Sequence, residues 1–249
     1  MELRLDGKIA LVTGGSSGLG ERFATVLAES GARVAMAARR LDRLELLKAA
    51  IEKRGGSAYA IALDVTKVAA IEEAVEKVER EFGLIDVLVN NSGVGVTKPL
   101  GKYNEADFDY VMDTNAKGAF FVAQSVGMRM LKRGSGRIIN ISSGAAINPR
   151  PGVSVYAMSK VAVVQMTRSM ALEWGPSGIN VNAICPGYIA TELTRGHLAS
   201  EAGKKLIATL PRKRAGKPAY LDGLIVYLAS DSSAFINGAI IKADDGDHL

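Results

Sequence analysis

The sequence predicts an α/β fold in which helices cover a doubly wound parallel sheet of seven strands. The first observation behind this prediction is that short apolar segments alternate with segments of helical spacing along the whole chain. The second is that several apolar segments, such as 9–12 and 87–89, contain no polar residue, which is typical of strands buried on both faces. Ligands of such sheets bind at the carboxyl ends of the strands, so we expect the functional residues there.

The first half of the chain alternates strands with helices. Phe23, Val26 and Leu27 fall on one face of the first helix. The second helix stops before Gly55 and Gly56, which are typical of a helix C-terminus. The expected strands are 8–12, 33–37, 58–63 and 86–89, and the expected helices are 21–29, 41–53 and 68–82.

The second half continues the alternation and contains one irregular stretch. The expected helices are 104–131, 155–174 and 219–229, and the expected strands are 136–141, 179–184 and 239–242. Residues 186–216 show no sustained periodicity, which predicts a loop with short helices. No shift in composition marks a boundary, so we expect a single domain over residues 1–249 with an irregular loop at about 187–217.

Composition excludes several classes of protein. The chain is 48% hydrophobic and 23% charged, which excludes wholesale disorder. Cys185 is the one cysteine, so a disulfide scaffold and a cysteine metal cluster are excluded. His197 and His248 are too few and too far apart for a metal site, and we therefore predict no bound metal.

The net charge of +5 comes mostly from scattered basic residues. The densest basic cluster, 212–214, has no nucleic-acid-binding motif near it and fits a solvated loop, so we expect no nucleic acid partner. The N-terminus lacks the basic and apolar regions of a signal peptide, and no apolar run reaches the ~20 residues of a membrane span. We expect a cytoplasmic protein without membrane contact.

Glycine is abundant, with 27 residues against 7 prolines, and one glycine-rich turn follows the first strand. Gly14, Gly18 and Gly20 stand in a G-x-x-x-G-x-G spacing directly before the first helix. Such a turn lets the backbone approach a ligand closely and directs the helix N-terminus at a pyrophosphate. A purely structural turn is the alternative, but the position between strand and helix favours dinucleotide binding.

The end of the second strand favours NADP over NAD. An Asp or Glu about twenty residues after the glycines would bind the ribose 2′-hydroxyl of NAD. The sequence has Ala37 and Ala38 there, followed by Arg39 and Arg40. Arginine can form a charge-assisted fork with a 2′-phosphate, and Arg39 is the better candidate because it directly follows the missing acid. The alternative is that both arginines only begin the next helix in solvent.

Tyr156 and Lys160 are the first candidates for chemistry, because their i, i+4 spacing puts them on one face of a helix. A nearby cation lowers the pKa of tyrosine from its usual value near 10. Lowering it by about three units requires roughly 4 kcal/mol, which a lysine in a partly wet site does not easily supply without a further cation such as a nicotinamide ring. Ser143, after a strand, and Asn115, a mediocre residue for a helix interior, are further candidates.

With these residues together, the chain resembles the short-chain dehydrogenase/reductase family over essentially its whole length. Within that family it is similar to the branch of about 250 residues that contains 3-oxoacyl-carrier-protein reductases and many alcohol and sugar dehydrogenases. Each motif is weak alone, but their order and spacing together are specific. The motifs are 13–20, Asp64 with Val65, 90–93, Asn115, Ser143, Tyr156 with Lys160, and Pro186 with Gly187.

The resemblance implies a Rossmann fold and a set of catalytic roles. Tyr156 would be the general acid in reduction and the general base in oxidation. Lys160 would lower the pKa of Tyr156 and hold the nicotinamide ribose. Ser143, which stands 13 positions before the tyrosine as in the family, would hydrogen-bond the substrate oxygen. Asn115 would kink its helix and hold a water in a proton relay to Lys160.

The resemblance also implies the contacts of the cofactor. Asp64 and Val65 would touch the adenine, and Asn90 the adenosine ribose and nearby backbone. Ile189 would flank the nicotinamide, and Thr191 would lie near its carboxamide. The full expected cofactor set is Gly14, Ser16, Ser17, Gly18, Leu19, Gly20, Arg39, Arg40, Asp64, Val65, Asn90, Asn91, Ser92, Gly93, Tyr156, Lys160, Pro186, Gly187, Ile189 and Thr191.

Three positions depart from the family pattern. Ser92 replaces a usual alanine, and Cys185 replaces a common alanine and is expected only to pack. Residues 244–247 read Asp-Asp-Gly-Asp in place of the usual Asp-Gly-Gly, near the last strand, where such enzymes often pair subunits. The resemblance implies a homo-oligomer, a tetramer or a dimer, with this departure at its expected interface.

The loops expected to line the substrate pocket are 94–97, 144–153 and 188–210, and most of their residues are apolar. The apolar residues expected at the pocket are Ala145, Ala146, Ile147, Pro149, Tyr188, Ile189 and Leu193. Such a lining suits a small carbon-rich ketone or alcohol. Arg150 could meet an acidic group, but an exposed loop arginine is the favoured interpretation.

Alternative functions stay open at this point. A 3-oxoacyl-carrier-protein reductase is one, although residues 175–178 offer no basic residue to recruit an acidic carrier. A dinucleotide-sensing protein without turnover is another, because fold alone does not separate it from an enzyme. The complete set Asn115, Ser143, Tyr156 and Lys160 favours the enzyme. A third is epimerisation or dehydration with the same cofactor and tyrosine.

Overall fold

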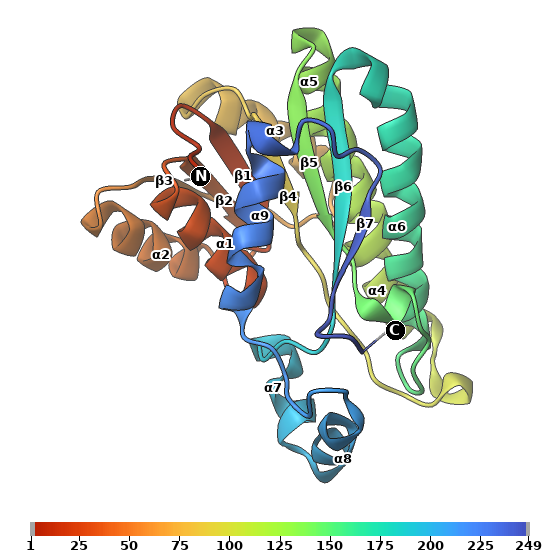
Figure 1. Cartoon of the computed structure of the whole chain (residues 1–249). Coiled ribbons are helices and arrows are strands. Elements are labelled where there is room, and N and C mark those ends of the chain that lie inside the picture. The colour runs from red at the N-terminus through yellow and green to blue at the C-terminus, as the bar shows by residue number, and fades with distance from the viewer. Residues whose placement is uncertain (1–2, 248–249) are drawn as a thin grey trace.

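The computed structural model describes residues 3–247 and contains a seven-stranded sheet in the order β3-β2-β1-β4-β5-β6-β7 (Figure 1). All pairs of neighbouring strands in it are parallel. The strands are β1 (Ile9–Thr13), β2 (Arg33–Ala38), β3 (Ser57–Ala62), β4 (Val87–Asn90), β5 (Gly136–Ile141), β6 (Ile179–Pro186) and β7 (Ile240–Ala243). The predicted doubly wound, seven-stranded parallel sheet is confirmed.

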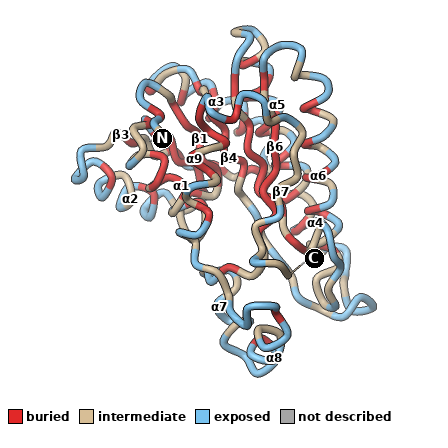
Figure 2. The backbone as a smooth tube through the Cα atoms, in the orientation of Figure 1, coloured by how far each residue is buried: buried red, intermediate tan, exposed pale blue. Residues whose placement is uncertain are grey.

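Helices cover both faces of this sheet. They are α1 (Gly18–Glu29), α2 (Leu41–Lys53), α3 (Val68–Glu81), α4 (Glu105–Met112), α5 (Ala119–Arg133), α6 (Ser154–Trp174), α7 (Glu192–Ala199), α8 (Glu201–Thr209) and α9 (Asp222–Ala229). The buried side chains of α1, α2 and α9 form one core cluster with the sheet, and those of α3, α5 and α6 form another. The buried strands run between these two layers (Figure 2).

Adjacent residues of one strand pack into the two opposite core clusters. Val12 of β1 packs with the α1, α2 and α9 cluster, whereas Leu11 packs with the other. This alternation follows from the two-residue period of a strand, and it explains why these strands contain no polar position.

The order of the strands places the ligand crevice. β1 pairs with β2 on one side and with β4 on the other, so the chain turns back across the sheet between β1 and β4. The loops after these two strands diverge there, which opens a crevice at their carboxyl ends. The glycine-rich turn follows β1 and therefore lies at this crevice.

The expected helix 104–131 is wrong in one respect. The structure divides it into α4 and α5 by a π-helical segment, Asp113–Gly118, which contains Asn115. The side chain of Asn115 forms two hydrogen bonds with the backbone of Val94. Its Nδ2 donates to the Val94 carbonyl oxygen at 2.9 Å, and its Oδ1 accepts from the Val94 N–H at 2.8 Å. This pull from outside the helix gives the physical reason for the wider turn, which periodicity alone does not reveal.

The irregular stretch after β6 contains α7 and α8, as short helices were expected there. These two helices form an arm that lies away from the sheet (Figure 1). The last expected helix, 219–229, begins as a 3₁₀ turn, Pro218–Leu221, before α9. Within residues 3–247, every helix is too short or too polar to cross a membrane.

The core contribution of α2 can be tested with two leucines of the same helix. Leu44 is completely buried, whereas Leu46 is 73% exposed. Leu44→Ala should lower the free energy of unfolding by about 2–5 kcal/mol, because it removes buried methyl groups and leaves a cavity. Leu46→Ala should change it by no more than about 0.5 kcal/mol. Urea unfolding of both variants measures the difference, and equal losses would contradict the assigned packing of α2.

Candidate active site

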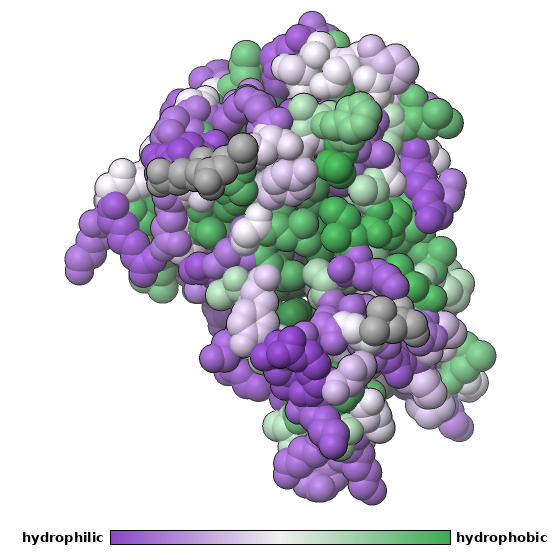
Figure 3. Space-filling view, viewed as in Figure 1, coloured by the Kyte–Doolittle hydropathy of each residue, from purple (hydrophilic) through white to green (hydrophobic). Residues whose placement is uncertain are grey.

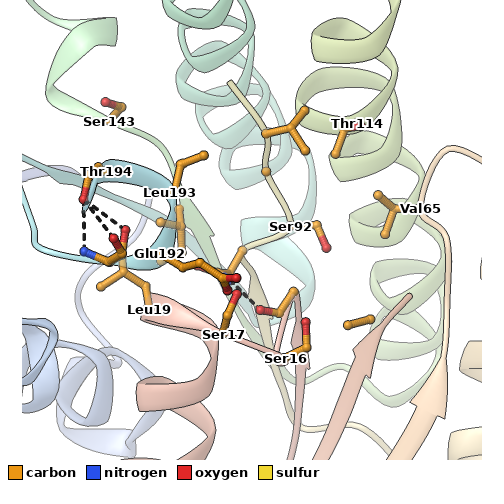
Figure 4. Close-up of a pocket in the computed structure, with 18 of the residues that line it drawn as sticks. Ser16, Ser17, Leu19, Val65, Ser92, Thr114, Ser143, Glu192, Leu193 and Thr194 are labelled. Atoms are coloured by element: carbon orange, nitrogen blue, oxygen red, sulfur yellow. Dashed lines mark hydrogen bonds between the residues drawn. The ribbon is translucent and has the colours of Figure 1, made fainter. Parts of the chain in front are cut away.

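A cavity of about 610 Å³ lies along the carboxyl ends of the strands. The glycine-rich turn, the segments after β2, β4, β5 and β6, and the start of α7 line it (Figure 4). The expected site residues that line this cavity are Gly14, Ser16, Ser17, Gly18, Leu19, Arg39, Arg40, Asp64, Val65, Asn91, Ser92, Gly93, Ser143, Tyr156, Lys160, Pro186, Gly187, Ile189 and Thr191. Gly20, Asn90 and Asn115 do not line it.

The glycines of the turn are required by its geometry. Gly14 and Gly18 have φ of +67° and +60°, a left-handed conformation that other residues rarely adopt. A Cβ on Gly20 would collide with the carbonyl oxygen of Gly14 and lie 2.6 Å from Asn91 Nδ2. The turn therefore brings the N-terminus of α1 close against β1, as binding of a pyrophosphate at that helix end requires. These residues fit a dinucleotide cofactor.

Hydrogen bonds join this turn to the segment after β4. Thr13 Oγ1 accepts from the backbone N–H groups of Asn91 (3.0 Å) and Ser92 (3.1 Å). The amide Nδ2 of Asn91 donates to the Thr13 carbonyl oxygen at 3.1 Å. The two strand ends that flank the crevice are thus held in a fixed relation.

The structure does not place Asn90 among the residues that line the cavity, and its expected contact with the adenosine ribose and nearby backbone stays a prediction. Its side chain is buried, and its Nδ2 donates to the carbonyl of Ala119 (2.7 Å) and to Asn140 Oδ1 (3.1 Å). Asn140 in turn donates to Thr167 Oγ1 at 3.0 Å. The side chain of Asn90 therefore ties the end of β4 to β5 and to the start of α5.

Ser143, Tyr156 and Lys160 line the same cavity from two different elements. Ser143 follows β5, and its Oγ accepts from the Ala145 N–H at 3.2 Å, which fixes the start of a 3₁₀ turn. Lys160 Nζ lies 5.8 Å from the centre of the Tyr156 ring, as their positions one turn apart on α6 predict. Lys160 Nζ donates to the carbonyl of Ile141 at 2.9 Å. The helix is thereby anchored to the end of β5.

Burial sets the ionisation of the two candidate catalytic groups. Burial raises the pKa of the Tyr156 phenol above its usual value near 10, and the hydrogen bond with Ser143 opposes that rise in part. Burial lowers the pKa of Lys160 to about 8. The expected lowering of the Tyr156 pKa is therefore not a property of the protein alone. The desolvation of the phenolate outweighs the hydrogen bond with Ser143, and a bound cationic ring would have to shift the balance.

Asn115 lies behind Gly93 and next to α6. Its Nδ2 donates to Ser159 Oγ at 3.0 Å, in addition to its bonds with Val94. A Cβ built on Gly93 would lie 3.4 Å from Lys160 Nζ and 3.5 Å from Asn115 Oδ1, so both polar atoms flank the same small space. The helix distortion expected at Asn115 is present, whereas its proton relay to Lys160 stays a prediction.

The two arginines after β2 have different surroundings. Arg40 donates to Ser17 Oγ (2.8 Å) and Ser16 Oγ (3.3 Å) and forms an ion pair with Glu192. Arg39 is exposed, and no hydrogen bond or ion pair holds its guanidinium among the residues described. Burial raises the pKa of Asp64, but hydrogen bonds from Thr66 and the charges of Arg39 and Lys67 outweigh it, so this pKa lies below its usual value.

Several cavity residues were not predicted from the sequence. These are Ala38, Leu63, Tyr110, Thr114, Ile141 and Ser142, whereas Val94, Glu192 and Thr194 come from loops that were expected to line the pocket. Glu192 directly follows Thr191, but no local pattern indicates that it reaches Arg40, 152 positions earlier. Only the fold brings these charges together.

The substrate end differs in part from the expectation. Ile189 and Leu193 line the cavity, whereas Ala145, Ala146, Ile147, Pro149 and Tyr188 do not. Arg150 is not an exposed loop arginine, because its side chain is only 28% exposed and its Nη2 lies 2.7 Å from Asp247 Oδ1. Cys185 is buried, as expected of a packing residue.

No cluster of three or more His, Cys, Asp or Glu side chains that could hold a metal occurs in the described part of the chain. His197 lies on α7, and His248 lies outside the described residues.

Comparisons with known proteins agree with this geometry. The family model described as short chain dehydrogenase matches residues 8–202. The gluconate 5-dehydrogenase of Gluconobacter oxydans (strain 621H) is 38% identical over 243 residues, covering 97% of this chain and 95% of that protein. The 3-oxoacyl-[acyl-carrier-protein] reductase FabG of Thermotoga maritima is 38% identical over 244 residues, covering 98% and 99%. A solved gluconate 5-dehydrogenase from Burkholderia cenocepacia J2315, in complex with NADP and tartrate, has a TM-score of 0.95 at 36% identity, covering 98% of this chain and 96% of that chain.

The lowered pKa of Lys160 predicts a pH-dependent stability of the protein without cofactor. The folded protein releases this proton at about pH 8, whereas the unfolded chain keeps it to about 10.5. Between these values the unfolded state binds more protons, so the wild type should gain stability over Lys160→Met as pH rises, by on the order of 3 kcal/mol. Urea unfolding of both proteins from pH 7 to 10.5 measures this, and a difference that stays constant with pH would contradict it.

Proposed function

The chain belongs to the short-chain dehydrogenase/reductase family and is an oxidoreductase of CH–OH groups, and we propose that it uses NADP(H) to interconvert a small carbonyl compound and a secondary alcohol. One observation carries this proposal. Ser143, Tyr156 and Lys160 line the same cavity as the glycine-rich turn and the arginines after β2. A dinucleotide bound at the turn would thus share one cleft with the groups that move a proton.

The nicotinamide, when bound, supplies or accepts the hydride at the substrate carbon. Tyr156 keeps its proton at neutral pH, because its pKa is raised, and it is therefore ready to protonate the carbonyl oxygen during reduction. Ser143 donates a hydrogen bond to the same oxygen and orients it. Lys160 is charged below pH about 8, and its ammonium favours the tyrosinate that remains after the transfer.

The preference for NADP rests on charge. No acid stands at Ala37 or Ala38 to bind a ribose 2′-hydroxyl, and Arg39 lines the cavity with a guanidinium that is available to a 2′-phosphate. The solved relative from Burkholderia cenocepacia contains NADP, which supports the same choice.

A small free substrate fits better than a carrier-bound one. The turn Gly175–Ser177 after α6 offers no basic side chain to an acidic carrier, and the gluconate 5-dehydrogenase relative acts on a small molecule by its name. Reduction of a 3-oxoacyl group on a carrier protein is the second candidate, because the Thermotoga maritima relative has that name at equal identity. Parallel assays with free ketones and with carrier-bound 3-oxoacyl groups separate the two.

We also propose a homo-oligomer, a dimer or a tetramer. β7 is the last strand of the sheet, and its residues are half-buried or exposed. Hydrophobic residues gather on the surface over this strand (Figure 3). An apolar edge strand of this kind suits contact with a second copy.

Replacement of the phenol tests the proton transfer. Tyr156→Phe should lower kcat by at least about 10²-fold, because the ring remains but the proton donor is lost. NADPH binding, measured by fluorescence titration, should change little. Tyr59→Phe, which removes a hydroxyl that binds Glu81 on the surface, is the control and should keep its turnover. Substantial turnover in folded Tyr156→Phe with bound NADPH would refute the assigned role.

Removal of the guanidinium after β2 tests the choice of cofactor. Arg39→Ala should raise KM for NADPH about tenfold, since a charge-assisted hydrogen bond to the 2′-phosphate is lost, and should leave KM for NADH nearly unchanged. Arg54→Ala, at the exposed C-terminal end of α2, is the control. Equal efficiency with both cofactors, unaffected by Arg39→Ala, would rule out the assigned preference.

A further inference from the structure

Glu192 lies where an anionic group of the cofactor is expected. Its Oε1 is 3.2 Å from Arg40 Nη1, and its Oε2 is 3.0 Å from Arg43 Nη1. Glu192, Arg40, Ser16 and Ser17 all line the cavity. The first residue of α7 thus lies beside Ser17 of the glycine-rich turn (Figure 4) and pairs with two arginines at the start of α2.

The same arginine that holds Glu192 also holds the turn. Arg40 Nη2 donates to Ser17 Oγ at 2.8 Å, while its Nη1 and Nη2 both approach the carboxylate. The pKa of Glu192 lies below its usual range. The main cause is the hydrogen bond from Arg40, and the hydrogen bond with Ser17 and the charge of Arg43 add to it. Glu192 is therefore an anion at neutral pH, and it uses donors that suit a phosphate equally well.

The start of α7 does not need this carboxylate. Thr191 is the N-cap of the helix, and its backbone N–H donates to Thr194 Oγ1 at 3.0 Å. Thr194 Oγ1 also donates to the carbonyl of Ile189 at 2.6 Å. These threonines provide the hydrogen bonds at the helix start, so the ion pairs of Glu192 with Arg40 and Arg43 are a separate contact.

We propose that Glu192 is a specificity-determining residue whose carboxylate competes with the 2′-phosphate of the cofactor for Arg40 and Arg43. A phosphate that takes these guanidiniums must displace Glu192 or lie beside a like charge, and both cost affinity. NADH has no 2′-phosphate and leaves the ion pairs intact. Glu192 thus reduces the difference in binding affinity between NADP and NAD that the arginines create.

The competition has a second consequence, because Glu192 begins the arm. Leu193 and Thr194 follow it directly and line the same cavity. Displacement of Glu192 by a 2′-phosphate therefore frees the segment that lines the cleft from its tie to α2. The inference rests on the proposed use of NADP, and its test uses binding rather than turnover.

The test compares Glu192→Gln with the wild type. The dissociation constants of NADPH, NADH, adenosine 2′,5′-bisphosphate and AMP are measured by calorimetry or nucleotide fluorescence. The variant should bind NADPH and the bisphosphate about three- to tenfold more tightly, the range expected for removing partly exposed ion pairs that compete with the ligand. Its affinities for NADH and AMP should stay within about twofold of the wild type.

Glu201→Gln is the matched control. This residue begins α8 on the same arm, is exposed, and pairs with Lys204 rather than with α2. It should leave all four dissociation constants unchanged. Higher salt should weaken the difference between wild type and Glu192→Gln, because the competing ion pairs are partly exposed and screened.

The possible outcomes separate this inference from the proposed function. The competition would be overturned if Glu192→Gln bound NADPH more weakly or equally well, or if its affinities for NADPH and NADH changed in parallel. The proposed oxidoreductase activity would still stand. A wild type that binds no nicotinamide nucleotide would overturn the proposed function and the competition together. Tighter binding confined to the two 2′-phosphorylated ligands supports the competition.

Discussion

The close approach of α1 to the glycine-rich turn is the contact on which the cleft depends. Gly20 touches the turn so closely that any side chain there would collide with the Gly14 carbonyl. Asn91 and Thr13 bond the turn to the segment after β4, so β1, α1 and that segment pack as one unit. The N-terminal end of α1 is thereby presented to the crevice between β1 and β4. Its unpaired N–H groups and partial positive charge favour a phosphate there.

Buried polar side chains align the end of the cleft that Ser143, Tyr156 and Lys160 line. Asn115 joins α6 through Ser159 and the segment after β4 through Val94, and the main chain widens into a π-helix around it. Ser142 Oγ donates to the Lys160 carbonyl at 2.8 Å. Each such bond adds only about 1 kcal/mol to stability, but an unpaired buried group would cost more. Their main effect is therefore geometric, since they fix helices against strand ends.

Burial and charge oppose each other at Tyr156 and Lys160. The same low polarity that raises the pKa of the phenol lowers that of the ammonium to about 8, so at neutral pH Tyr156 keeps its proton and Lys160 is still mostly charged. Proton transfer to a carbonyl oxygen suits this state, whereas abstraction of a proton from an alcohol needs added positive charge. Charges that a bound ligand brings next to Tyr156 and Lys160 would shift both pKa values. Elsewhere at this cleft, the charges of Arg40 and Arg43 are balanced by their ion pairs with Glu192.

The order of apolar strands and helices in the sequence determined the parallel sheet, and with it the meeting of the segments after β1, β2, β4, β5 and β6 in one cleft. That prediction succeeded because parallel strands bring their carboxyl ends to a common edge, whatever the details of packing. Tertiary structure alone decided the π-helical turn at Asn115, the inward direction of Asn90 and the reach of Glu192 to Arg40. Each of these depends on a partner far away along the chain, and local periodicity and propensity carry no information about which distant atoms a polar side chain will meet.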